Sequence, residues 1–215
     1  MYLSKLILDP RSRRVQREVA EPYQMHRSLM RAFPDDLKEG DERVLFRLEP
    51  GRNGSLVLLV QSWGFPDWSW LSAPEAGSYL LPVAEPNPAV KAFDLPLAPG
   101  QILAFRLRAN PTVKRRFNEK DHKRVGIYDE QEQLAWLERK GESGGFRLLS
   151  ARTTDGHDVG GKIRRDRETH TLKLAAVQFD GLLQVAEPAI LRETVRHGIG
   201  SGKGLGFGLL SLARP

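Results

Sequence analysis

The chain has 215 residues, of which 40% are hydrophobic and 28% charged, a composition typical of a globular protein with one large or two small domains. The absence of cysteine excludes disulfides, thiolate zinc sites and cysteine nucleophiles. With no long apolar run and no signal-peptide pattern, the sequence predicts a cytoplasmic protein without a membrane partner, and the net charge of +6 favours a polyanion.

The first part of the chain predicts the element order strand, helix, strand, strand, helix, strand. Residues 1–9 alternate apolar and polar side chains, which is typical of a strand. A helix is expected over 21–33, because Pro22 suits a first helical turn and Pro34 ends the pattern. The remaining predicted elements are two strands at 43–50 and 55–63 joined by a hairpin, a short helix within 66–76 and a closing strand at 77–85.

The same order of elements is predicted a second time after a proline-rich stretch. Strands are expected at 101–109, 146–151, within 171–186 with a turn at Asp180-Gly181, and at 206–213; helices are expected at 129–141 and 187–198. Two such units predict an α+β protein of two tandem ferredoxin-like (RRM-like) domains, each an antiparallel sheet with helices on one face. The expected boundaries are 1–85 for the N-terminal domain, 86–99 for a linker and 100–215 for the C-terminal domain.

Two basic clusters lie in the predicted C-terminal domain, in stretches that resemble loops. A single basic run is most simply a solvated face, but two in loop-like positions favour contact with phosphates, with a membrane surface as the less favoured alternative. The first cluster comprises Arg106, Arg108, Lys114, Arg115, Arg116, Lys120, Lys123 and Arg124. The second comprises Lys162, Arg164, Arg165 and Arg167.

Near the end of the chain, glycine occupies every even position from 198 to 208. The spacing fits neither a Walker loop nor the dinucleotide fingerprint, and the loop runs from helix to strand rather than from strand to helix, so no nucleotide cofactor is expected. A flexible connection is one interpretation. The other is a backbone cradle for a phosphate chain, with Gly200, Gly202, Lys203 and Gly204 as the binding candidates.

The first predicted helix carries the candidate catalytic groups. Tyr23 and His26 are three residues apart and share one face, with Arg27 and Arg31 on a neighbouring ridge. A partly buried, hydrogen-bonded histidine is one interpretation. The alternative is metal-free RNA cleavage, in which one group takes a proton from a ribose 2′-hydroxyl, another protonates the leaving 5′-oxygen and a cation stabilises the phosphorane. No histidine pair has the spacing of a helical metal site, so neither a metal nor another cofactor is expected.

Five segments occur in a familiar order: "MYLSKLIL", "YQMH", "FRLRANP", "AWLERK" and "GIGSGKGLGFGLLSLA". Together they resemble the CasE family of CRISPR-associated endoribonucleases, which process precursor CRISPR RNA in type I-E systems, and the resemblance spans essentially the whole chain.

The resemblance implies a catalytic histidine at His26, its partner tyrosine at Tyr23, a catalytic cation at Arg31 and RNA-groove contacts at Arg164 and Arg165. It also implies that the glycine-rich loop packs between the domains near RNA. Cleavage at the base of a repeat stem-loop would give a 5′-hydroxyl and a 2′,3′-cyclic phosphate. The enzyme would keep the mature guide RNA and join a CRISPR surveillance complex.

Two other function classes remain open from the residues. One is a non-catalytic subunit that binds an RNA hairpin, although the aromatic RNP pattern of an RRM is missing. The other is a small-molecule enzyme or structural subunit whose glycine-rich loop binds a phosphorylated ligand.

Overall fold

The computed structural model describes residues 1–34, 42–73, 77–116, 122–155, 159–165 and 168–215; the side chains of 116, 122, 155, 161–165 and 168–173 are outside the description. The chain forms two compact units. Unit 1 comprises Met1–Leu95 together with Lys203–Gly206, and unit 2 comprises Pro96–Gly202 together with Phe207–Pro215. A short piece of the glycine-rich loop therefore belongs with the N-terminal unit.

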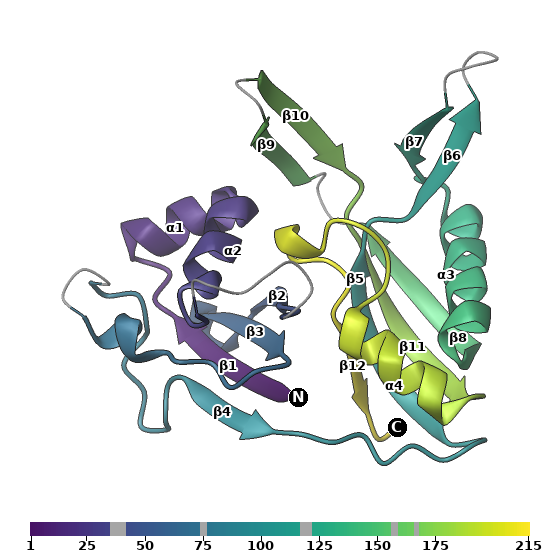
Figure 1. The fold of residues 1–215 in the computed structure, drawn as a ribbon, viewed down its shortest axis with the longest axis horizontal. Coiled ribbons are helices and arrows are strands. Elements are labelled where there is room, and N and C mark those ends of the chain that lie inside the picture. The colour runs from purple at the N-terminus through teal and green to yellow at the C-terminus, as the bar shows by residue number, and fades with distance from the viewer. Residues whose placement is uncertain (35–41, 74–76, 117–121, 156–158, 166–167) are drawn as a thin grey trace. The chain divides into compact units, whose positions relative to one another are not determined.

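Unit 1 contains a four-stranded antiparallel sheet in the order β2-β3-β1-β4 (Figure 1). Its strands are β1 (Tyr2–Leu8), β2 (Leu45–Pro50), β3 (Leu56–Ser62) and β4 (Ala89–Ala92). Its α-helices are α1 (Arg13–Ala20) and α2 (Pro22–Met30), and its 3₁₀ turns are η1 (Arg52–Gly54), η2 (Ser69–Ser72) and η4 (Lys203–Leu205).

One face of this sheet forms the core of unit 1. Along β1, Ser4, Leu6 and Leu8 are buried, whereas Lys5 is exposed and Ile7 is partly buried, so alternate side chains point to opposite faces. The inward side chains pack with Met25 and Leu29 of α2. This packing fixes the rotation of α2 about its axis, and with it the direction of its polar residues.

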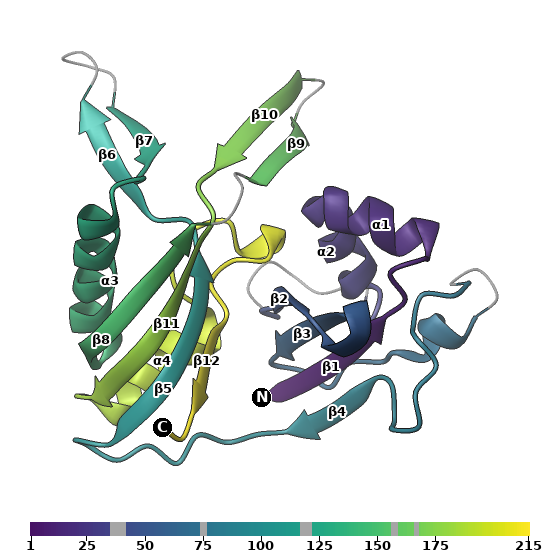
Figure 2. The same cartoon turned by 180° about the vertical axis from the view of Figure 1, so that it is seen from behind.

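Unit 2 repeats the arrangement with the sheet order β12-β5-β11-β8, all neighbouring pairs antiparallel. Figure 2 shows the open face of this sheet, with α4 behind it. The elements are β5 (Ile102–Ala109), α3 (Glu130–Gly144), β8 (Phe146–Asp155), β11 (Val177–Val185), α4 (Pro188–His197) and β12 (Leu210–Ala213). In both units the first strand lies between the third and the fourth, which confirms the predicted pair of tandem ferredoxin-like folds.

Two β-hairpins extend from unit 2 and carry most of each basic cluster, while Arg106 and Arg108 lie on β5 (Figures 1 and 2). The sequence analysis expected loops at these positions, and that prediction is wrong, because most of each basic cluster lies on paired strands. The hairpin strands are β6 (Thr112–Arg116) with β7 (His122–Gly126), and β9 (Val159–Arg165) with β10 (Glu168–Leu174).

Three other details differ from the sequence prediction. The closing strand of the first sheet is β4, not 77–85, where Leu80 makes only an isolated bridge to Leu8. Asp180-Gly181 is not a turn but the middle of β11, where a side chain at Gly181 would clash with the backbone of Ser150. The helix α1 was not anticipated. Among the described residues, no helix is both long and apolar enough to cross a membrane.

Candidate active site and RNA interface

The helix α2 presents Tyr23 and His26 from one face, one turn apart. It begins with Pro22 in its first turn, which supports the predicted start of the helix. The side chain of Tyr23 is 41% exposed, so its phenol is open to solvent and to a substrate. His26 is partly buried, and its surroundings determine which ring edge remains usable.

The ring of His26 packs against β2 and η4. The imidazole stacks on Phe46 with centroids 6.3 Å apart and planes 14° from parallel. On the η4 side, a Cβ built at Gly204 would be 3.5 Å from Cδ2 and 3.7 Å from Nε2 of His26. The Nδ1 atom is buried and has no hydrogen-bond partner among the described residues. Burial lowers the pKa of His26 below 6.5, so the ring is neutral at neutral pH.

The glycine-rich loop divides between the two units. In unit 1, Gly206 has φ +84°, and a Cβ there would be 3.1 Å from the Phe46 ring. In unit 2, Gly200 packs beside Trp136, and Gly202 packs beside Phe207. The structure thus brings Lys203 and Gly204 into the same unit as Tyr23 and His26, while Gly200 and Gly202 support unit 2.

The arginines that follow His26 lie in different surroundings. Arg27 is exposed in the last turn of α2. The guanidinium of Arg31 lies over the ring of Trp70, 4.5 Å from its centroid, and that of Arg14 lies over the same ring at 4.9 Å. Trp70 therefore holds two cations beside the end of α2, an arrangement that no local sequence pattern indicated.

A buried polar network ties α1 to α2, and the sequence analysis missed it. Glu18 is 2% exposed and forms an ion pair with Arg14 at 2.9 Å. The hydroxyl of Ser28 donates to Glu18 at 2.6 Å, and the hydroxyl of Tyr79 donates at 2.7 Å. Burial, together with the charge of Glu18, raises the pKa of Tyr79, which therefore remains a donor. The one local signal was the four-residue spacing of Arg14 and Glu18.

The predicted RNA-binding residues of unit 2 are described in part. Arg108 is half-buried, with its guanidinium 5.2 Å from the centroid of Phe207. Lys114 and Arg115 are exposed on β6, opposite Arg124 and Lys123 of β7. For the remaining candidates only the backbone is described, and their side chains are outside the described part: Arg116, Lys162, Arg164 and Arg165.

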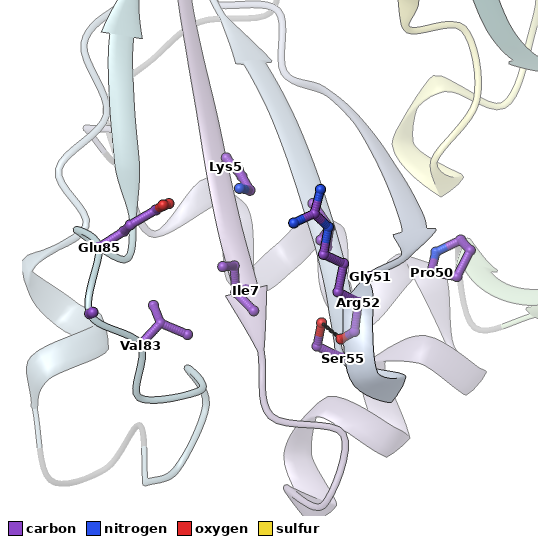
Figure 3. Close-up of a pocket in the computed structure, with 10 residues that line it drawn as sticks. Lys5, Ile7, Pro50, Gly51, Arg52, Ser55, Val83 and Glu85 are labelled. Atoms are coloured by element: carbon purple, nitrogen blue, oxygen red, sulfur yellow. Dashed lines mark hydrogen bonds between the residues drawn. The ribbon is translucent and has the colours of Figure 1, made fainter.

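A groove of about 770 Å³ lies on unit 1 against the sheet face opposite α2 (Figure 3). Ile7 and Val57 contribute apolar surface, while Lys5, Arg52 and Glu85 contribute charges. Because β1 alternates, these side chains point away from the face that carries α2 and His26. The groove is therefore separate from the candidate catalytic residues.

The described residues contain no group of three or more histidine, aspartate or glutamate side chains able to hold a metal ion. The polar side chains that α2 carries on either side of His26 in sequence include the phenol of Tyr23 and the cation of Arg27. Such groups suit proton transfer and the stabilisation of a negatively charged phosphate.

Comparison with known proteins places the whole chain in one family. A family model described as "CRISPR associated protein" matches residues 1–214. The CRISPR-associated endoribonuclease Cse3 of Thermus thermophilus is 42% identical over 222 residues, covering 99% of this chain and 100% of the relative. The CRISPR system Cascade subunit CasE of Escherichia coli K12 is 32% identical over 227 residues, covering 99% of each.

A solved structure of Thermus thermophilus Cse3, bound to an RNA representing a pre-cleavage complex, has the same fold. It superposes with a TM-score of 0.78 at 43% identity and covers 99% of this chain and 98% of its own. The chain therefore belongs to the CRISPR-associated protein family, and it is an endoribonuclease.

Proposed function

We propose that this chain cuts precursor CRISPR RNA at the base of each repeat stem-loop, without a metal ion, leaving a 5′-hydroxyl and a 2′,3′-cyclic phosphate. The observation that carries the proposal is the site on α2. There a neutral imidazole, packed against Phe46 and Gly204, lies one helical turn from the exposed phenol of Tyr23. The related Thermus protein, bound to an RNA that represents a pre-cleavage complex, supports RNA as the substrate class.

In the proposed reaction the ribose 2′-oxygen attacks the adjacent phosphorus. A base removes the 2′-hydroxyl proton, the phosphorus–O5′ bond breaks, and an acid delivers a proton to the departing O5′. His26 performs one of these two proton transfers, and Tyr23 orients the nucleotide or stabilises the charged phosphorane. Arg31 supplies positive charge from its position over Trp70.

The stem-loop is held through its phosphates by the hairpins and the glycine-rich loop. A-form RNA has a deep, narrow major groove that side chains read poorly, so charge and shape carry recognition. On β6 and β7, Lys114 lies opposite Arg124, and Arg115 lies opposite Lys123. Like charges placed directly opposite each other repel, and a phosphate chain between them relieves that repulsion. Arg27, Arg108 and the β9 cluster extend the proposed contact.

The family also suggests which macromolecules this chain assembles with. CasE of E. coli is named as a Cascade subunit, and we assign this chain the corresponding place in a surveillance complex that contains the mature guide RNA.

The test uses a labelled cognate repeat hairpin in EDTA, with both product ends mapped. Wild-type protein should cut once, at the stem base, and His26→Ala should cut about 10²–10⁴-fold more slowly with nearly unchanged hairpin affinity. His197→Ala is the matched control, because His197 is exposed at the end of α4. Binding without cleavage by the wild type would instead identify a hairpin-binding subunit, and a strict need for magnesium would contradict the mechanism.

A further inference from the structure

Phe46 packs beside the imidazole of His26. It is on β2, is 2% exposed, and belongs to the sheet face that forms the core with α2. The two rings are nearly parallel and, with centroids 6.3 Å apart, laterally offset, so the apolar rim of Phe46 packs along the histidine ring. Such a contact limits rotation of the imidazole and keeps water from that side of it.

The two nitrogens of His26 are unequal in this setting. Nδ1 is buried without a partner among the described residues, which leaves Nε2 as the nitrogen available to a substrate. An imidazolium has two N–H donors, and burying one of them unpaired is costly. The packing that holds the ring therefore favours its neutral form as well.

Gly206 makes room for Phe46. A Cβ at Gly206 would lie 3.1 Å from Cε2 of Phe46, closer than ordinary packing allows, and the φ of +84° already disfavours a side chain there. The end of the glycine-rich loop is thus shaped to accept the aromatic ring that supports His26.

The elements packed around His26 also carry charged side chains. On β2, Arg47 and Glu49 form an ion pair at 2.8 Å and alternate with Phe46, so they point to the opposite sheet face. The other titratable side chains on these elements are Tyr23 and Arg27 on α2 itself and Lys203 on η4. The pKa of His26 is lowered by burial.

We propose that Phe46 is a positioning residue for RNA cleavage: its ring holds the imidazole of His26 so that the Nε2 edge meets the scissile phosphate group. This inference rests on the proposed function of His26. Phe46 itself does not touch the RNA in this scheme and acts through the histidine.

The test compares Phe46→Leu, which removes the flat ring but stays apolar, with the wild type. The matched control is Phe179→Leu, because Phe179 is likewise buried and stacked, on Trp136 in unit 2, with centroids 6.1 Å apart and planes 20° from parallel. Three quantities are measured: the pKa of His26 by NMR without RNA, the single-turnover cleavage rate at saturating hairpin against pH, and the hairpin Kd. If Phe46→Leu does not fold, Phe46→Met replaces it, because the flexible unbranched side chain of methionine adapts better to an irregular gap.

We expect Phe46→Leu to move the pKa of His26 toward 6.5 and to shift the pH–rate profile in the same direction. The maximal rate should fall about 10–100-fold, because the proton-transfer group is no longer held in place, while the hairpin Kd stays within about twofold. Phe179→Leu should change neither the pKa nor the profile.

The outcomes separate the two proposals. An unchanged pKa and pH profile in folded Phe46→Leu would overturn the role of Phe46 and leave that of His26 intact. A shifted pKa, with His26→Ala still cutting at the wild-type rate, would show that the proposed function of His26 is wrong, and the role of Phe46 in cleavage would fall with it.

Discussion

Gly204 lies against the imidazole of His26, although the two residues come from opposite ends of the chain: a Cβ at Gly204 would be 3.5 Å from Cδ2 of the ring. The last segment of unit 1, Lys203–Gly206, thus completes the surroundings of the helix that carries the candidate catalytic groups. The glycines of this segment differ in what a side chain would meet, and that difference can be measured.

Gly206→Ala should destabilise the protein more than Gly204→Ala. At Gly206 the new methyl would press on Phe46 at 3.1 Å and the φ is +84°, whereas at Gly204 it would make ordinary contact with His26. Forcing a residue with a side chain into the left-handed region costs about 1–2 kcal/mol. Thermal unfolding should show a clearly lower Tm for Gly206→Ala, and equal Tm values would contradict this account of the loop.

The lowered pKa of His26 predicts a pH dependence of stability. The unfolded chain binds a proton near pH 6.5, whereas the folded chain binds it only at lower pH. The contribution is therefore fully present above pH 6.5, decreases as pH falls toward the folded pKa, and is lost below that value. Urea unfolding at a series of pH values in this window gives the free energy of unfolding at each pH. This free energy should change less steeply with pH in His26→Asn than in the wild type, and His197→Asn should leave its pH dependence unchanged.

Replacing Glu18 with alanine should strongly lower the free energy of unfolding. It accepts from Arg14 at 2.9 Å, from Ser28 at 2.6 Å and from Tyr79 at 2.7 Å while almost fully buried. Glu18→Ala leaves a cation and two hydroxyls without their acceptor, at a cost of about 3–5 kcal/mol in the free energy of unfolding. The control is Glu193→Ala, an exposed surface ion-pair residue expected to change stability by less than about 0.5 kcal/mol. Similar losses for both would exclude a structural role for the network.

Replacing Arg164 and Arg165 with alanine should weaken hairpin binding and reduce its salt dependence. Each lost phosphate contact lowers the slope of log K against log salt by about 1. The control removes the same charge from exposed Arg139 and Arg147 on α3 and β8 and should leave the slope unchanged. If the two double variants have equal slopes, the β9 cluster does not contact phosphate.

The sequence predicted the elements whose pattern is local. Alternating side chains predicted the strands of both sheets except β4, and proline at the start of α2 and α4 predicted the start of two helices. The spacing of Tyr23 and His26 placed them on one helical face, since that requires only helix periodicity. The closing strand β4 was missed because it is four residues long and mostly exposed, so it carries no alternating pattern.

The tertiary structure alone decided what surrounds these residues. The basic stretches pair as hairpins, although their many charged residues make the sequence resemble a loop. The stack of Phe46 on His26, the contact of Gly204 with the same ring and the bond from Tyr79 to Glu18 join segments far apart in the chain. Periodicity reports which face a side chain takes, but the partner on that face is chosen by packing across the whole unit, where burial and exclusion of water act together.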